Sequence, residues 1–446
     1  MPCATNVLMR CPVLQLLMRY ASTRIACSCA SIIRLMSSPC LSPLALVHSA
    51  IIAVFAFTAT ASAAAEMAEP DCNQPARDPL VFFQLSGHPF EPIPTGDGCY
   101  VFVSLPSHDR GLPSRIAVIR RSAGEFSTIR EIPVKGSPTG MVLSHDGKVL
   151  VAATGNVAFL DAERLISGHG EPVLGYLNTG SGAGTVYANL TDDDKYLFVS
   201  NEDKASITVV NFEKARHNGF RQDSIIGVTP VGPAPIALSF SPDGKVLYTT
   251  IEGARPQDNW PATCKPEVLD APHLHNAPPG AVIAIDVEKA TQDPAHAEIA
   301  RTPAGCSPVR LALSSAGDRA YVTARASDAV LVIDTRKLLQ HAADPVIASI
   351  PVGSSPVGIW LSENGSRLVA TNSNRFASTR NQKQSLSVVD TANITAGNKA
   401  VIGTIAAGSF PREIRASADS RTLFVTNFLS DTLEIIDLAR LSKSMQ

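Results

Sequence analysis

The sequence predicts an all-β fold, a seven-bladed β-propeller whose ring is closed by an N-terminal strand that completes the last blade. A phrase of glycine, proline and alternating apolar residues returns through most of the chain. Each copy places a tight-turn signal between two short strands. The chain also has an extra strand before the first copy and lacks one after the last. Repeats of about 40–50 residues with four short strands are typical of propeller blades.

Six copies of the phrase are clear, beginning at Gly136, Gly180, Gly232, Gly305, Gly353 and Gly408. The copy at 232–251 reads GPAPIALSFSPDGKVLYTTI. In most copies Gly-x-x-Pro turns the chain into the first strand, and an Asp-Gly or related pair forms the hairpin to the second. A third strand then ends in an acid or amide, as in Val330–Asp334. Alternating apolar residues in each strand predict half-buried strands.

A seventh, weaker copy covers Gly87–Arg120, and an unassigned strand, Leu80–Leu85, precedes it. The last copy stops after its third strand, so Leu80–Leu85 can supply the fourth. This closure leaves no free sheet edge. We therefore expect one domain over 70–446, with blades near 87–133, 134–178, 179–229, 230–302, 303–350, 351–405 and 406–446 plus 80–85.

Composition excludes several classes of protein. Apolar residues make up 45% of the 446 residues and charged residues 17%, which excludes a disordered chain and suffices for a core. The net charge is −2. Because no basic surplus is available, nucleic acid is not an expected partner.

The first 65 residues predict a cleaved export signal. They contain four arginines and no acid, a 14-residue apolar run over 44–57, and Ala61-Ser62-Ala63 as a cleavage site near Ala63–Ala65. The apolar run is too short to span a membrane. Either Met1 or Met36 can be the start. We expect an exported protein, periplasmic or secreted, that is a monomer with no membrane span after cleavage.

Nine cysteines divide between the leader and the propeller. Five lie in the first 65 residues, which leaves Cys72, Cys99, Cys264 and Cys306. Four cysteines in an exported protein suit two disulfides. We favour Cys264–Cys306, which would pin a long insertion, and Cys72–Cys99 as the remaining pair. A metal site formed by Cys264, His273 and His275 is the weaker alternative.

Short tags carry a resemblance to a known family. Tyr321-Val-Thr323, Phe198-Val-Ser-Asn201 and Phe424-Val-Thr-Asn427, with the Ser-Pro-Asp-Gly turn at 241–244, resemble the YVTN-type β-propeller repeat. The resemblance covers nearly all of the chain after the leader. It implies the propeller fold and kinship with extracytoplasmic binding and surface proteins, with lactonases of the 6-phosphogluconolactonase type as distant relatives. It does not fix the function.

The innermost strand of each blade should line the central channel. The apolar residues at every second position of this strand should pack between neighbouring blades. The residues at the positions between them should face the channel. In most blades these channel positions are small or apolar. The exceptions, charged or aromatic, are Glu91, Tyr187, Arg310, Trp360, Glu413 and Arg415. They predict either a site for a polar small molecule or a set of ion pairs that satisfy one another.

Three insertions should gather at one mouth of the channel. They cover 253–280, 374–384 and 106–114, each between the second and third strands of its blade. That connection emerges where the innermost strand begins. Long loops on a rigid scaffold are a common place for binding residues.

Two functions of different class remain open. One is a non-catalytic module that binds a small molecule or partner protein at the mouth. The other is a lactonase-like hydrolase, in which Glu413 or Glu91 activates water and Arg310 or Arg415 holds the oxyanion. No Cys-x-x-Cys-His haem motif occurs and we expect no cofactor, although a divalent metal could assist the hydrolase. A solvent-open, unpaired carboxylate would favour the hydrolase, and a glutamate paired with each arginine would favour the binding module.

Overall fold

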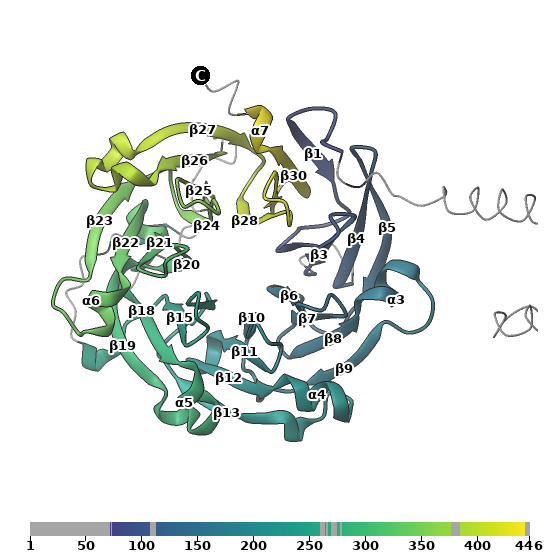
Figure 1. Ribbon diagram of the computed structural model, residues 1–446, viewed down its shortest axis with the longest axis horizontal. Helices are drawn as coiled ribbons and strands as arrows, with labels where there is room; N and C mark the ends of the chain where they lie inside the picture. Colours follow the sequence, from purple (N-terminus) through teal and green to yellow (C-terminus); the bar gives the residue numbers. More distant parts are fainter. Residues whose placement is uncertain are drawn as a thin grey trace, which may run out of the picture. The chain divides into compact units, whose positions relative to one another are not determined.

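Seven four-stranded antiparallel sheets are arranged in a ring about a central axis, as the sequence predicts (Figure 1). The computed structural model describes residues 72, 74–107, 113–258, 264, 266–268, 274–276, 279–375 and 384–441. Residues 70–446 form one compact unit. The expected export signal and His273 lie outside the described residues. None of the helices that are described has the length and apolar character needed to cross a membrane.

The strands of the first four blades run outward from the channel in chain order. Blade 1 contains β2 (Pro92–Pro94), β3 (Tyr100–Leu105), β4 (Arg115–Ser122) and β5 (Glu125–Pro133). Blade 2 contains β6 (Met141–Leu143), β7 (Val149–Ala153), β8 (Val157–Asp161) and β9 (Val173–Leu177). Blade 3 contains β10 (Thr185–Leu190), β11 (Tyr196–Asn201), β12 (Ser206–Asn211) and β13 (Ile225–Pro230). Blade 4 contains β14 (Ser239–Phe240), β15 (Val246–Ile251), β18 (Pro279–Asp286) and β19 (Glu298–Cys306).

The remaining blades follow the same plan. Blade 5 contains β20 (Pro308–Leu313), β21 (Arg319–Ala324), β22 (Ala329–Asp334) and β23 (Val346–Pro351). Blade 6 contains β24 (Pro356–Leu361), β25 (Arg367–Asn372), β26 (Gln384–Asp390) and β27 (Val401–Ala407). Blade 7 contains β28 (Pro411–Ala416), β29 (Thr422–Asn427), β30 (Thr432–Asp437) and, as its outer strand, β1 (Leu80–Gln84).

The outer strand of blade 7 closes the ring. It pairs antiparallel with β30, from Leu80 opposite Ile436 to Gln84 opposite Thr432. The first and last described strands therefore share one sheet, and the predicted closure is confirmed (Figure 1).

The turn between the first two strands of a blade is held by its own side chains. In blade 4 the Ser241 hydroxyl donates to the Asp243 carboxylate at 2.6 Å and accepts from the Val246 amide at 2.9 Å. Gly244 adopts a positive φ of 70°, which suits glycine. The repeated Ser-x-Asp-Gly signal therefore fixes the hairpin and leaves the aspartate at the surface.

The acid or amide that ends a third strand caps a short helix. Asp161, Asn211, Asp286 and Asp334 each accept a hydrogen bond from a backbone amide three residues later. An N-cap of this kind satisfies an amide that has no partner within the helix. The capped helices are α3 (Ala162–Ser167), α4 (Phe212–Asn218), α5 (Val287–Gln292) and α6 (Thr335–Leu339). A last short helix, α7 (Leu438–Leu441), follows β30, and the 3₁₀ segment η8 (Thr391–Ala400) follows β26.

The core is divided into layers between successive blades. Tyr248 of blade 4, for example, belongs to one buried cluster with Leu311 and Val322 of blade 5. Between blades 2 and 3, Phe159 stacks on Phe220 with ring centres 4.3 Å apart. Since each blade covers the apolar face of the next, burial of these side chains holds the ring together.

Candidate functional site

A buried hydroxyl on the second strand of a blade positions the channel residue beside it. Thr323 accepts from the Arg310 amide at 3.0 Å and donates to the Val357 carbonyl of blade 6 at 2.7 Å. Six blades carry such a donor to the next blade: Ser104, Ser200, Thr250, Thr323, Thr371 and Thr426. The threonine or serine of the Tyr-Val-Thr type of tag thus joins neighbouring blades and fixes the innermost strand.

Arg310 and Glu413 form a two-pronged ion pair in the channel. Arg310 Nε donates to Glu413 Oε2 at 3.1 Å, and a second guanidinium nitrogen contacts Oε1. Both side chains are buried, and the guanidinium lies 4.2 Å from the ring centre of Tyr187. Burial alone would lower the pKa of Arg310, but Glu413 raises it above its usual value. Arg310 is therefore a permanent cation that is already neutralised.

Glu91 is held by Arg415 and by a backbone amide. Arg415 Nη2 contacts Glu91 Oε1, and Glu91 Oε2 accepts from the Met141 amide at 2.7 Å. Burial raises the pKa of Glu91 to about 7, against the opposing effect of Arg415, and the nearby Glu413 adds to the rise. Glu91 is fully buried, whereas the Arg415 side chain is 37% exposed. Both glutamates are thus occupied by arginines.

The channel cluster consists of Glu91, Tyr187, Arg310, Glu413 and Arg415. Two separate cavities adjoin it, because Tyr187 and Arg415 line one of them and Arg310 lines the other. The hairpin-side mouth, of about 840 Å³, is lined by Ile93, Thr95, Asp97, His145, Asn189 and Arg415 among others. The insertion-side mouth, of about 320 Å³, is lined by Val186, Ile236, Val309 and Val357 with Glu202, Glu252 and four arginines. The arginines are Arg310, Arg325, Arg375 and Arg412.

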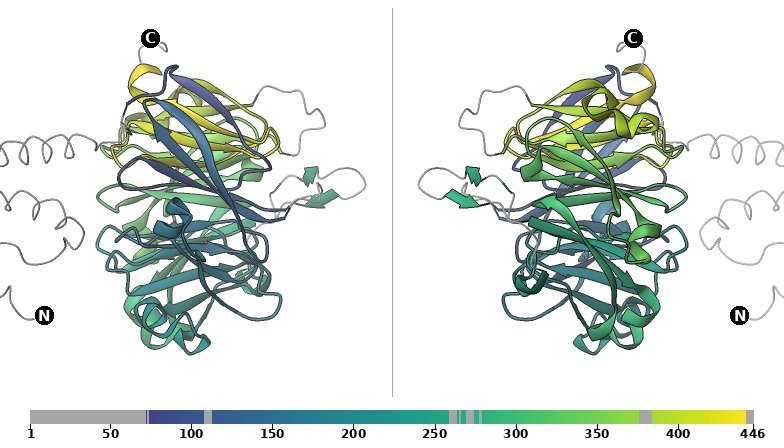
Figure 2. Two further views of the ribbon diagram at one scale, coloured as in Figure 1. Left: turned by 90° about the vertical axis from the view of Figure 1, so that its right-hand side faces the viewer. Right: turned by 90° about the vertical axis from the view of Figure 1, so that its left-hand side faces the viewer.

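The insertion-side mouth is formed where the innermost strands begin. Glu202, Glu252, Arg325 and Arg375 all follow the second strand of a blade. β16 (Pro266–Val268) and β17 (Leu274–Asn276), which pair within the blade 4 insertion, project from one face of the ring (Figure 2). Arg325 donates to both carboxylate oxygens of Glu252, at 2.9 and 3.1 Å.

Arg412 is the main residue of this mouth that sequence reasoning missed. Its guanidinium lies 3.8 Å from the ring centre of Phe90 and 5.4 and 5.6 Å from those of Phe410 and Phe428. Burial and the nearby Arg375 lower the pKa of Arg412 to about 9. A signal was available, because the equivalent positions in the other blades are uncharged: Phe90, Thr139, Val186, Ile236, Val309 and Val357.

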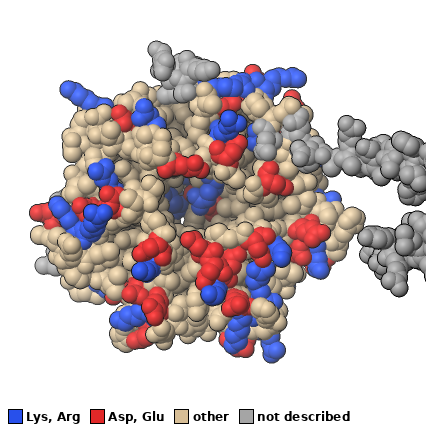
Figure 3. Space-filling view, viewed as in Figure 1, with Lys and Arg blue, Asp and Glu red and all other residues tan. Residues whose placement is uncertain are grey.

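The hairpin-side mouth has the opposite charge at its rim. Its hairpin turns carry exposed acids, such as Asp97, Asp146, Asp193, Asp243 and Asp419. Figure 3, which views the ring from the face opposite β16 and β17, shows acidic side chains around the central hollow and basic ones within it. The two mouths therefore present different chemistry.

Trp360 corrects one expectation. The structure brings Glu91, Tyr187, Arg310, Glu413 and Arg415 together, but Trp360 lines a separate cavity of about 580 Å³ with Ile405 and Leu438. It packs against the apolar layer between blades 6 and 7. The reason is that sheets in a propeller stand radially, so a large apolar side chain on the innermost strand can turn toward the neighbouring blade.

Both predicted disulfides are present. Cys264 and Cys306 join the blade 4 insertion to the end of β19, with Cα atoms 5.6 Å apart. Cys264 therefore cannot supply a thiolate to a metal. No group of three potential metal ligands occurs among the residues that the structure describes. Disulfides are typical of an oxidising compartment.

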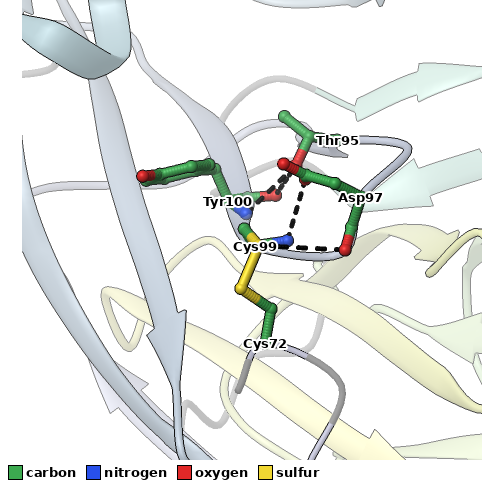
Figure 4. The surroundings of a disulfide bond; sticks show 5 residues. All are labelled: Cys72, Thr95, Asp97, Cys99 and Tyr100. Carbon is green, nitrogen blue, oxygen red and sulfur yellow. Dashed lines mark hydrogen bonds between the residues drawn. A yellow bond between two sulfur atoms is a disulfide. The ribbon is translucent and has the colours of Figure 1, made fainter. Parts of the chain in front are cut away.

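The second disulfide, Cys72–Cys99, has its Cα atoms 4.7 Å apart and lies at the blade 1 hairpin (Figure 4). There Asp97 accepts from the Cys99 amide at 3.0 Å, and Thr95 accepts from the Tyr100 amide at 3.0 Å. The bond joins the segment before β1, which belongs to blade 7, to the turn of blade 1.

Comparisons with known proteins show the fold. No family model and no curated sequence matches the chain. The solved structure of hydrazine synthase from Kuenenia stuttgartiensis is similar, with a TM-score of 0.59 at 14% identity over 80% of this chain and 97% of that one. Candidate 6-phosphogluconolactonases from Bacteroides fragilis and Bacteroides uniformis give TM-scores of 0.54 and 0.52, each at 16% identity. They cover 77% and 74% of this chain and 92% and 89% of their own. Likeness at such identities establishes a shared propeller architecture.

Proposed function

We propose that this protein is a non-catalytic binding module of an exported, oxidising compartment, and that it takes its ligand at the insertion-side mouth. One observation carries the proposal: arginines occupy both channel glutamates. A general base must reach the proton that it removes. Glu413, 1% exposed in its ion pair with Arg310, and Glu91, fully buried, cannot meet a substrate without breaking these pairs.

The location of the site follows from the scaffold. The insertion-side mouth combines the second-to-third-strand connections of several blades with charged side chains that the rigid channel holds in place. Loops carried by a rigid scaffold are a usual site of binding. The two disulfides fit the export that the leader predicts.

A thermal-shift screen of the purified protein against small organic acids, sugars and lactones tests the proposal. A ligand that binds the folded state raises the melting temperature. We expect the shift to be lost in Arg375→Glu, at the insertion-side mouth, and kept in Lys148→Glu, a matched charge reversal on the hairpin side.

Turnover assays on sugar and acyl lactones, with and without divalent metal, separate the two functions. We expect no hydrolysis above the uncatalysed rate. Hydrolysis that disappears in Glu413→Gln would establish the lactonase-like hydrolase instead. If the thermal shift is lost in Lys148→Glu and kept in Arg375→Glu, the ligand binds at the hairpin-side mouth, and the proposed location is wrong.

A further inference from the structure

We propose that the insertion-side mouth binds a small organic anion through a carboxylate group that Arg412 and Arg375 hold. This inference rests on the proposed function and deepens it, because it assigns a chemical class of ligand to the same mouth. Three observations support it: the state of Arg412, the balance of charge and the shape of the lining.

The guanidinium of Arg412 is fixed in place by aromatic rings, but its Nε lacks a hydrogen-bond acceptor among the described residues. Phe90, Phe410 and Phe428 surround its guanidinium, with ring centres 3.8 to 5.6 Å away. Stacking of this kind fixes the plane of the guanidinium fork. Arg412 Nε is buried without a hydrogen-bond partner in the described part of the chain. Because a buried donor without an acceptor is unfavourable, this group is prepared for an acceptor supplied from outside.

A second guanidinium shares this aromatic support. Arg375 lies 5.3 Å from the ring centre of Phe410, and Arg412 lies 5.4 Å from the same centre. Two cations near one ring repel each other, and Arg375 contributes to the lowered pKa of Arg412. An anion between them would relieve this repulsion.

The charges that line the mouth leave a positive surplus. Glu413 neutralises Arg310, and Glu252 neutralises Arg325. Among the described lining residues, Glu202 is then the acid left beside Arg412. Burial and the nearby Glu252 raise the pKa of Glu202 above its usual value. With four arginines against two glutamates, the described lining of the mouth suits an anion, whether a monocarboxylate or a dicarboxylate.

The lining favours an organic anion over an inorganic one. Val186, Ile236, Val309 and Val357, one from each of four consecutive blades, supply an apolar surface in a cavity of about 320 Å³. An organic acid can place its carboxylate on the arginines and its carbon body on these side chains. The planar fork of arginine matches a carboxylate with two parallel hydrogen bonds. Inorganic phosphate would leave the apolar surface uncovered.

Isothermal titration calorimetry of the whole protein at pH 7 tests the inference, with benzoate, succinate, inorganic phosphate and choline as probes. We expect at least one of the two carboxylates to bind, phosphate to bind at least tenfold more weakly, and choline not to bind. Arg412→Met keeps a long side chain against the three rings, and it should weaken carboxylate binding at least tenfold. Arg412→Lys keeps the charge but loses the planar fork of the guanidinium. Its affinity for the carboxylate should lie between those of the wild type and Arg412→Met.

Two further variants keep the test decisive. Arg375 is exposed, so Arg375→Ala should fold even if Arg412→Met does not, and it should also weaken binding several-fold. Arg336→Met removes an exposed arginine on α6, which follows the third strand of blade 5 and is not among the residues that line the mouth, and it should leave binding unchanged.

The outcomes separate this inference from the proposed function. Phosphate binding as tight as carboxylate binding, with the same dependence on Arg412, would overturn the carboxylate assignment. If no anion binds while a screened compound still gives an Arg375-dependent thermal shift, the inference fails and the proposed function stands. If neither anions nor screened compounds bind, both fail.

Discussion

The ion pair of Arg310 with Glu413 should be a strong determinant of stability. Removing one partner of a buried pair leaves an uncompensated charge and typically costs about 3–5 kcal/mol. We expect Arg310→Met to lower the free energy of unfolding by that amount in urea titrations followed by circular dichroism. The double variant Arg310→Met/Glu413→Gln should lose less than the sum of the single losses. Arg367→Met, which breaks an exposed pair with Asp390, is the control and should cost at most about 1 kcal/mol. Additive losses in the double variant would show that the pair is not coupled.

Glu434 should make stability depend on pH. This side chain on β30 is fully buried and accepts from Asn427 Nδ2 at 3.0 Å. Burial raises its pKa from 4.5 to about 7. The folded state therefore retains a proton that the unfolded state loses. The resulting stabilisation is complete below pH 4.5 and is lost as the pH rises through 7.

Glu434→Gln removes this titration and keeps an oxygen that can accept from Asn427. At pH 8 we expect the variant to be more stable than the wild type by up to about 3 kcal/mol, and at pH 5 nearly equal to it. Denaturant unfolding at the two pH values measures the difference. Glu213→Gln, an exposed change on α4, should show no such difference. An equal effect of Glu434→Gln at both pH values would show that the carboxyl does not titrate in this range.

At the scale of the element, the Cys72–Cys99 bond joins the segment before β1 to the hairpin between β2 and β3. The two cysteines are 27 residues apart in sequence, and a loop of that size predicts a stabilisation of about 3–4 kcal/mol. We expect Cys72→Ser/Cys99→Ser to lose that free energy in guanidinium unfolding. Under reducing conditions, which break both disulfides of the wild type, the variant and the wild type should be equally stable, because neither then has the Cys72–Cys99 bond. If it is as stable as the oxidised protein, the bond contributes nothing to the folded ring.

The repeated elements were predictable because their signals are local. The Ser-x-Asp-Gly hairpin and the apolar alternation specify each strand within a few residues. The acid at the end of the third strand was visible in the sequence, but its role as the cap of α3, α4, α5 and α6 appears only in the structure. The pairing of β1 with β30 could be predicted because each end of the chain has an incomplete blade.

The site was less predictable because it depends on contacts between blades. Strand alternation identified Glu91, Arg310 and Glu413 as unusual, but it does not specify which arginine meets which glutamate. Arg412 comes one residue before Glu413, which faces the channel. Strict alternation along the strand therefore assigns Arg412 to the residues that pack between blades and not to those that line the channel. Trp360 is at a position expected to face the channel, yet its large apolar ring packs between blades 6 and 7.

At the scale of the whole molecule, the ring depends on its outermost strand in blade 7. Deletion of residues 1–85 would remove β1 and leave the backbone groups of β30 without partners along one edge. Exposed edges promote association between chains. Because this deletion also removes Cys72, the matched control is a deletion of residues 1–69 that carries Cys72→Ser and Cys99→Ser, and the longer deletion also carries Cys99→Ser. We expect the longer deletion to melt at a lower temperature than this control, and to form oligomers in size-exclusion chromatography with light scattering. A monomer with an unchanged melting temperature would show that closure by β1 is dispensable.

The closure of the ring also sets an order of assembly. Gln84 donates to the carbonyl oxygen of Asp431, which is 347 residues away in sequence. Blades 1 to 6 each form from one continuous stretch of chain, so they can fold while later segments are still being made. Blade 7 cannot, because one strand is made first and its partners are made last. The first strand to be synthesised, β1, therefore remains unpaired until β30 has been made. Bringing such distant segments together is intrinsically slow. Until they meet, the partly folded protein carries an unprotected sheet edge, and its exposure to aggregation lasts as long as this final step.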